Sequence, residues 1–246
     1  MPVVINPEKL TRTATAKRGS RPDHVYAVLR LAILEQAIGP GAKLPEDSIG
    51  EQLGVSRTVV RRALEKLAAE ELVEIAPNRG ASVARPTIEE ARDIFAVRIE
   101  LERLVVERVC GKLKPLQYKI LDDWVTDEER AYRDATGDYI RQAAEFHVIL
   151  AEMAASPVLL KYIKSLVVRS SLILRLYGRP NWPSCNVDEH RSIIAALRDN
   201  DGKRAWQTMS EHLDAVLHRA LDSGVREADP SVTDVISKYA GIVESA

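Results

Sequence analysis

Residues 53–64 read LGVSRTVVRRAL, and this stretch decides the fold of the first part of the chain. Gly54 supplies a tight turn, and Ser56 is a good N-cap for a following helix. From Arg57 to about Glu70, apolar residues recur at positions i, i+3, i+4, i+7 and i+8, while polar and cationic residues occupy the remaining positions. The pattern predicts a helix that packs on one face and leaves the other face free.

The segments around this helix predict a winged helix-turn-helix. Residues 24–36 have helical apolar spacing and end at a Gly-Pro-Gly sequence, and a short second helix precedes the turn. After the third helix, residues 72–75 alternate like a strand, and residues 81–83 can return as its partner. Three helices followed by a β-hairpin over residues 23–86 are typical of this fold.

Beyond residue 86, almost every segment has the periodicity of a helix. Gly, Pro and Asn-Asp clusters separate the periodic stretches. The expected helices span residues 88–113, 116–133, 138–155, 158–177, 187–199 and 202–222. We therefore predict a mostly α protein, in which an N-terminal winged helix-turn-helix with a small β-hairpin precedes an all-α antiparallel helical bundle over residues 87–226. Residues 1–22 predict a flexible arm, and residues 227–246 a tail with one short helix of undetermined position.

Composition narrows the class of protein. The chain has 246 residues, of which 46% are hydrophobic and 29% charged, without the roughly 18 uninterrupted apolar residues of a membrane span and without a secretory signal. We expect a cytoplasmic protein. Cys110 and Cys185 are too few and too far apart for a disulfide framework or a Cys-rich zinc site, so they predict reduced thiols. Residues 1–86 carry 13 Lys and Arg against 10 Asp and Glu, whereas the remainder carries 22 against 26, which is compatible with a basic DNA-facing part.

The free face of the third helix carries residue types that read DNA. Arg57, Thr58 and Arg61 lie in its first turn and a half, where side chains reach base edges in the major groove. Arg62 lies further round and is suited to the phosphate backbone. The alternative is that these arginines are simply solvated.

The hairpin loop carries a second candidate. Arg79 at the loop tip can enter a minor groove, where negative potential attracts arginine, and Gly80 permits a positive φ. The alternative is an ordinary solvent-exposed loop arginine.

Residues 24–84 resemble the DNA-binding domain of GntR-type bacterial regulators. The residues that carry the resemblance, in the family's order and spacing, are Pro40-Gly41, Leu44-Pro45-Glu46, Leu53-Gly54-Val55-Ser56-Arg57-Thr58, Val60-Arg61, Ala63-Leu64, Leu67, Leu72-Val73 and Asn78-Arg79-Gly80. The resemblance implies that Arg57, Thr58, Arg61 and Gly80 contact the operator. The full candidate DNA-binding set adds Ser56, Arg62 and Arg79.

Two positions depart from that family's pattern. Asp47 stands where the family often has a DNA-contacting arginine, and Arg62 replaces its usual glutamate. The operator sequence and the phosphate contacts can therefore be particular to this chain.

Residues 88–222 resemble the FCD-type all-helical ligand-binding domain of the fatty-acid-regulator (FadR-like) branch of the same family. The residues that carry this resemblance are Phe95-Ala96-Val97-Arg98, Leu101-Glu102, Phe146-His147, Glu189-His190-Arg191-Ser192-Ile193, Leu197, Asp201, Ala205, Met209 and His212-Leu213. In many relatives, an Asp and a His one helical turn apart and two further His hold a divalent metal. His147, His190 and His212 match the three His positions, but Ala143 replaces the Asp.

Three neutral histidines can bind zinc, nickel or a related ion and leave positions open for water, an effector or another side chain. The alternative is that they are hydrogen-bonded core or surface residues. In the resembling family, the arginine that matches Arg98 faces the effector pocket, where a guanidinium suits a carboxylate ligand. Its alternative is an intrahelical pair with Glu102. Further pocket candidates, which the sequence does not place, are Asp188, Glu189, Arg169 and Arg175.

Together these patterns predict a ligand-responsive transcription regulator. A homodimer would bind a pseudo-palindromic double-stranded operator, and the resemblance implies repression that a small organic acid relieves. We assign no catalytic residue and expect no enzyme activity. One competitor, a helical metal-dependent enzyme, leaves the first 86 residues unexplained. Another, a winged-helix protein that contacts only proteins, would tolerate loss of Arg57 and Arg61.

Overall fold

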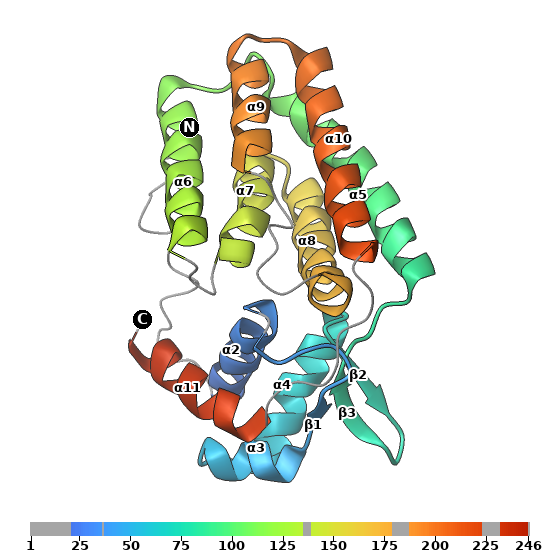
Figure 1. Ribbon diagram of the computed structural model, residues 1–246. Helices are drawn as coiled ribbons and strands as arrows, with labels where there is room; N and C mark the ends of the chain where they lie inside the picture. Colours follow the sequence, from blue (N-terminus) through green and yellow to red (C-terminus); the bar gives the residue numbers. More distant parts are fainter. Residues whose placement is uncertain (1–20, 36, 135–138, 179–186, 223–231, 246) are drawn as a thin grey trace.

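The computed structural model describes residues 21–35, 37–134, 139–178, 187–222 and 232–245. Within these ranges the chain forms two hydrophobic cores, a small one in the N-terminal part and a larger one inside a bundle of helices (Figure 1). Cys110 is a free thiol. Cys185 and nearly all of the arm expected over residues 1–22 lie outside the described residues.

The N-terminal part has the predicted winged helix-turn-helix. Its elements are α2 (Arg21–Leu34), β1 (Lys43–Leu44), α3 (Glu46–Gln52), α4 (Arg57–Ala69), β2 (Val73–Ala76) and β3 (Gly80–Val83). The sheet has the order β1-β3-β2, and both pairs are antiparallel. The sequence does not predict β1, because two residues show no alternation. The strand pairs with β3 through Leu44 opposite Ala81, and the Leu44 side chain is buried.

The bundle contains the predicted six helices within the described residues. They are α5 (Ile88–Val109), α6 (Pro115–Arg133), α7 (Tyr139–Met153), α8 (Pro157–Tyr177), α9 (Val187–Arg198) and α10 (Gly202–Leu221). Helix α10 packs against α5 and α9, while α7 packs against α6 and α8. The helix starts have local causes: Pro115 and Pro157 occupy first turns, and the Asp201 side chain caps α10.

Helix α8 contributes to both cores, whereas the last helix of the chain belongs to the smaller core. Helix α8 contributes Ile163 to the larger core, and it contributes Val168 and Leu172 to the smaller one. Helix α11 (Val232–Ser245) packs against α2 and α3, where Ile236 and Tyr239 are buried, and Figure 1 shows it beside those helices at the opposite end of the molecule from α9. The first and last described helices therefore share one core.

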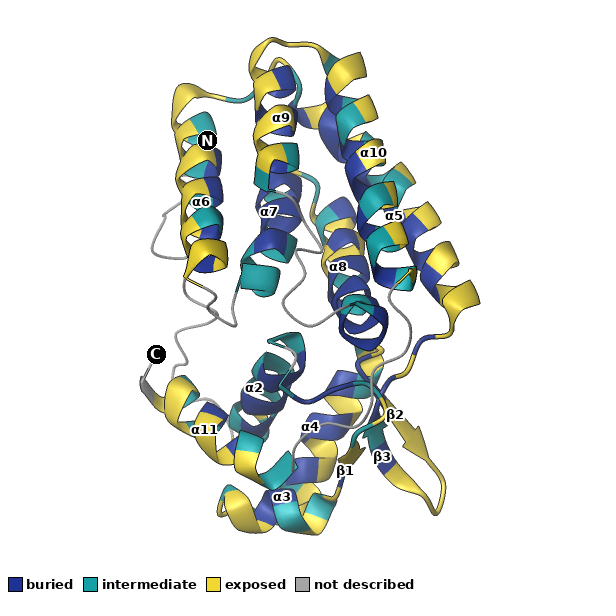
Figure 2. Ribbon diagram, viewed as in Figure 1, coloured by how far each residue is buried: buried dark blue, intermediate teal, exposed yellow. Residues whose placement is uncertain are grey.

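Burial follows the helical periodicity. In Figure 2, buried residues line the inside of the bundle, and exposed residues lie along the outer sides of α5 and α6. None of the helices in the described ranges is both long and apolar enough to cross a membrane.

Candidate functional site

Helix α4 starts at a close approach to α3. Ser56 is the N-cap residue with extended backbone, although its side chain makes no capping hydrogen bond. A Cβ added to Gly50 of α3 would lie 2.9 Å from the backbone oxygen of Val55, so only glycine lets the two helices meet this closely. Val60 and Leu64 are buried side chains of α4, so the opposite side of this helix faces solvent.

The predicted DNA-reading residues of α4 all lie on this exposed side: Ser56, Arg57, Thr58, Arg61 and Arg62. The side chains of Arg57 and Arg61 are 61% and 55% exposed. Both reach back to Glu46, the first residue of α3. Arg57 Nε donates to its carboxylate at 2.6 Å, and Arg61 donates through Nε and Nη2, each at 3.0 Å. These hydrogen bonds, with Arg61 contributing most, hold the pKa of Glu46 below its usual range.

Arg79 and Gly80 lie at the exposed tip of the β2–β3 hairpin. Gly80 has φ of +75°, the conformation for which a glycine was expected there. The hairpin projects from the N-terminal part next to α4 (Figure 1). Helix α4 and the β2–β3 hairpin are the two elements with which a winged helix can reach DNA, and both are exposed to solvent here.

Three histidines from different helices meet inside the bundle. His147 of α7, His190 of α9 and His212 of α10 are buried, and one ring nitrogen of each lies within 4.8 Å of the others. The Nε2 atoms of His147 and His212 are 3.3 Å apart. Residues 65 positions apart in sequence are therefore brought into direct contact.

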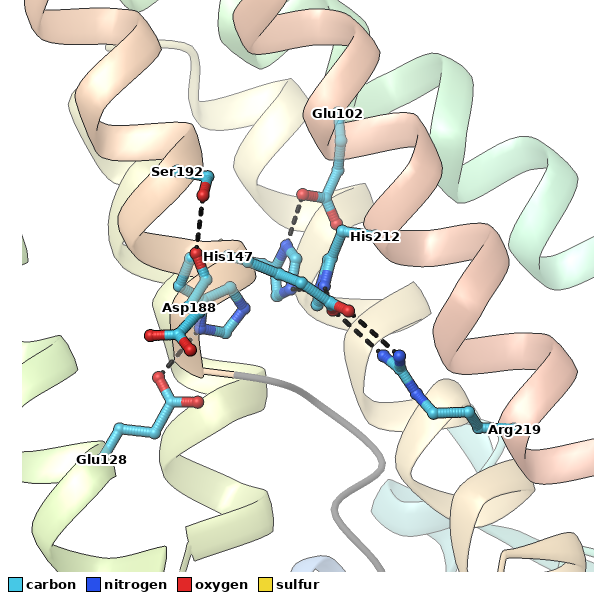
Figure 3. Close-up of polar contacts among 9 residues, drawn as sticks. Glu102, Glu128, His147, Asp188, Ser192, His212 and Arg219 are labelled. Carbon is cyan, nitrogen blue, oxygen red and sulfur yellow. Dashed lines mark hydrogen bonds and ion pairs between the residues drawn. The ribbon is translucent and has the colours of Figure 1, made fainter.

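Each histidine faces a carboxylate through its other nitrogen (Figure 3). The Nδ1 atoms are 2.5 Å from Glu102 for His147, 2.8 Å from Glu128 for His190, and 2.7 Å from Glu189 for His212. Arg219 holds the Glu189 carboxylate with two hydrogen bonds of 3.0 Å. The sequence reasoning overlooked Glu128 and did not place Glu189.

Burial and these partners set the charges of the cluster. Burial lowers the pKa of His147 to about 3 and that of His212 to about 4, because a charged imidazolium loses its hydration. Burial alone would raise the pKa of Glu102 and Glu189. The histidine and arginine next to each carboxylate outweigh burial and lower the pKa of both to about 2. Near neutral pH, His147 and His212 are therefore neutral, and Glu102 and Glu189 are ionised.

A small cavity of about 20 Å³ adjoins the histidines. Its lining includes Arg98, His147 and His212, with Ser170 and Ser171 from α8. Arg98 donates through Nε to Glu102 at 2.7 Å, so the intrahelical pair considered for these residues is present. Its Nη2 atom is buried and has no hydrogen-bond partner among the described residues. The same arginine therefore pairs within α5 and lines the cavity.

The remaining pocket candidates have different positions. Glu189 supports His212, whereas Asp188 lies 3.8 Å from Arg191 near the surface. Arg169 forms an ion pair of 2.8 Å with Glu71, in the turn after α4. Arg175 is buried in α8.

Two family patterns match the chain and together cover its two parts. The pattern of the bacterial regulatory proteins of the gntR family matches residues 22–83, and the pattern of the FCD domain matches residues 93–215. The chain belongs to the GntR family. Its FCD domain agrees with the FadR-like branch expected from the sequence.

Relatives of this GntR regulator are similar along most of their length. The HTH-type transcriptional repressor RspR of Escherichia coli (strain K12) is 26% identical over 194 residues, which are 78% of this chain and 85% of the relative. The Uxu operon transcriptional regulator of the same strain is 27% identical over 236 residues, or 85% and 90%. The crystal structure of a putative GntR transcriptional regulator from Rhodococcus sp. RHA1 is 26% identical, with a TM-score of 0.71 over 83% of this chain and 99% of that one.

The protein is thus a DNA-binding transcriptional regulator with an FCD effector-binding domain, and it is not an enzyme. The helical metal-dependent enzyme considered above is excluded by this membership. The winged-helix protein that contacts only proteins does not agree with this membership either, because the gntR family pattern and the named relatives are those of transcriptional regulators that bind DNA.

Proposed function

We propose that this GntR regulator is a dimeric repressor that leaves its operator when a small carboxylate compound binds beside the histidine cluster. The observation that carries the effector assignment is the state of Arg98. Its guanidinium is buried in the cavity wall, and Nη2 lacks a hydrogen-bond partner among the described residues. A buried charged donor without a partner is unfavourable, and a carboxylate would supply a charge-assisted hydrogen bond.

The histidine cluster fits a divalent metal ion. A neutral imidazole carries hydrogen on one nitrogen only, and each Nδ1 faces a carboxylate, so each Nε2 keeps its lone pair. Two nitrogen ligands of one tetrahedral zinc, each at about 2.0–2.1 Å, lie about 3.3 Å apart. The Nε2 atoms of His147 and His212 have this separation. Carboxylates behind ligating histidines are a regular feature of metal sites.

His147, His190 and His212 would hold zinc, nickel or a related ion. Ala143 lines the cavity and supplies no ligand atom, which leaves a position for water, the effector or another side chain. A bound divalent ion would act as a Lewis acid toward an effector carboxylate.

Because the cavity is small, binding of an effector would require the helices that line it to move. A volume of about 20 Å³ holds about one water molecule, so an organic acid must widen the cavity. Helix α8 lines the cavity through Ser170 and Ser171, and its Val168 and Leu172 side chains lie in the smaller core. Widening would therefore displace a helix that touches the DNA-binding part, and in a dimer this would change the spacing of the two α4 helices.

On the DNA side, α4 would enter the major groove with Arg57, Thr58 and Arg61, while Arg62 and Ser56 face the phosphate backbone. Arg79, on the turn that Gly80 permits, would reach the minor groove. The proposal that the protein represses transcription, rather than activating it, is supported by the name of the relative RspR. Such a protein works where the DNA is, in the cytoplasm.

Replacing an arginine of α4 tests the DNA assignment. Arg57→Ala or Arg61→Ala should weaken binding to a footprinted fragment of the gene's own promoter by about 1–3 kcal/mol, which is roughly 5- to 150-fold, in a gel-shift assay. Circular dichroism and size-exclusion chromatography should show unchanged folding and dimerisation. Arg92→Ala, at an exposed position of α5, is the matched control. Unchanged promoter affinity in both α4 variants would refute the assignment.

A further inference from the structure

Helix α3 begins with two acidic residues that have different surroundings. The Glu46 side chain is only 13% exposed and lies beneath the two α4 arginines, accepting hydrogen bonds from both. The Asp47 side chain is 72% exposed, and its Oδ2 atom lies 3.6 Å from Arg57 Nη1. The Glu46 carboxylate therefore lies under the proposed DNA-contacting arginines, whereas the Asp47 carboxylate is exposed on the same surface as they are.

The hydrogen bonds to Glu46 fix which donors face outward. Arg61 uses the edge formed by Nε and Nη2, so Nη1 and the outer hydrogen of Nη2 stay available. Those two donors form the end of the guanidinium, which can pair with O6 and N7 of one guanine. Arg57 gives Nε to the same carboxylate, and its Nη1 atom lies 3.6 Å from Asp47 Oδ2. Glu46 thus leaves a guanine-reading fork on Arg61.

An arginine side chain that is held in its bound direction before DNA arrives favours selective binding. A long arginine loses rotamer freedom when it docks, and a side chain already held in its bound direction loses less. The carboxylate under two guanidiniums is compensated, so it adds little repulsion toward phosphates. Asp47 differs, because its exposed charge faces the approaching backbone and competes for Arg57.

We infer that Glu46 is a positioning residue for DNA reading, which makes sequence selectivity depend on its carboxylate, and that Asp47 opposes DNA binding irrespective of sequence. This inference rests on the proposed contacts of Arg57 and Arg61 with DNA. Glu46 would therefore raise the selectivity for one DNA sequence, whereas Asp47 would lower the affinity for any DNA.

The experiment compares two DNA duplexes of equal length. One is the duplex that the wild-type protein enriches from a randomised pool, and the other is an unselected mixed-sequence duplex. Affinities are measured over a range of salt concentrations for the wild type and for two sets of variants. The first set is Glu46→Gln, Glu46→Ala and Asp47→Asn, and the second is Arg57→Ala and Arg61→Ala. Glu51→Gln, which removes an exposed carboxylate from the same helix, is the matched control.

Both Glu46 variants should lower the ratio of selected to unselected affinity about tenfold, the effect of losing one well-placed bidentate contact. Asp47→Asn should strengthen binding to both duplexes by the same factor, leave the ratio unchanged, and make binding more dependent on salt. A merely destabilised variant would lose active protein for both duplexes equally, so the ratio separates positioning from folding.

The outcomes distinguish this inference from the function on which it rests. If Arg57→Ala and Arg61→Ala lower the ratio but the Glu46 variants keep it, the positioning role is refuted. A fall in the ratio with Asp47→Asn refutes the opposing role. If the arginine variants also keep the ratio, the DNA-reading assignment itself is wrong.

Discussion

Glu128 carries a charge on the apolar stripe of a helix. It follows Leu121 and Val125 on the buried side of α6, and it is itself almost completely buried. A carboxylate at such a position needs a partner, because unpaired burial of charge is strongly unfavourable. The partner is His190, whose Nδ1 atom lies 2.8 Å from the carboxylate. An acid in the stripe was the signal in the sequence, although it does not identify the partner.

Replacing Glu128 tests the proposed metal site without removing a ligand. Glu128→Gln keeps an oxygen acceptor for His190 but loses the negative charge that makes the imidazole a better ligand, so metal affinity should fall about 10–100-fold. Zinc titration after chelation measures the affinity. Glu129→Gln, at the neighbouring position where the side chain is 36% exposed, should bind zinc like the wild type.

The proposed metal site also predicts how many metal ions each purified chain contains. Elemental analysis of the purified wild type should find about one divalent ion per chain, and the combined His147→Ala and His212→Ala substitutions should abolish it. A metal-free wild type that binds no added zinc would contradict the site.

Sequence reasoning succeeded where the signal is local and failed where it is not. The apolar stripe of α4 places Arg57 and Arg61 on the solvent side, and the structure agrees. Their shared contact with Glu46 depends on how α3 meets α4, which no periodicity records. The histidines were found by family resemblance, since spacings of tens of residues show no pattern of their own.

At the scale of elements, the first bundle helix starts at a capping box. The Thr87 side chain accepts the backbone N–H of Glu90, and the Glu90 carboxylate accepts the backbone N–H of Thr87. Thr87→Ala should therefore lower the free energy of unfolding by about 1 kcal/mol at neutral pH. Urea denaturation followed by circular dichroism measures this difference. A change below about 0.3 kcal/mol would show that the cap contributes little.

The same cap predicts a dependence on pH. The hydrogen bond from the Thr87 backbone, followed by that of its side chain, lowers the pKa of Glu90. A carboxylate with a lowered folded pKa contributes stability above its unfolded pKa of about 4.3, and this contribution is lost as pH falls through the folded value. Wild-type stability should therefore fall more steeply than that of Glu90→Gln below about pH 4.

At the scale of the whole molecule, one helix joins the two cores and another returns from the bundle to the smaller core. Helix α8 lines the cavity on one side and places Val168 and Leu172 in the smaller core on the other. Helix α11 follows the bundle in sequence but packs in the N-terminal part. The sequence predicted α11 as a helix and not its location, because an amphipathic stripe does not say which of two cores it covers.

Substitutions in α11 test whether it stabilises the DNA-binding part. Ile236 is fully buried against that core, so Ile236→Ala should lower stability by about 2–5 kcal/mol. Ile242 lies on the same helix but is 39% exposed, so Ile242→Ala should cost less than about 1 kcal/mol. Hydrogen exchange should locate the effect, with amides of α2 and α3 losing protection in Ile236→Ala while those of α10 keep it. Equal effects of the two substitutions, or loss of protection confined to the bundle, would show that α11 does not stabilise the winged helix.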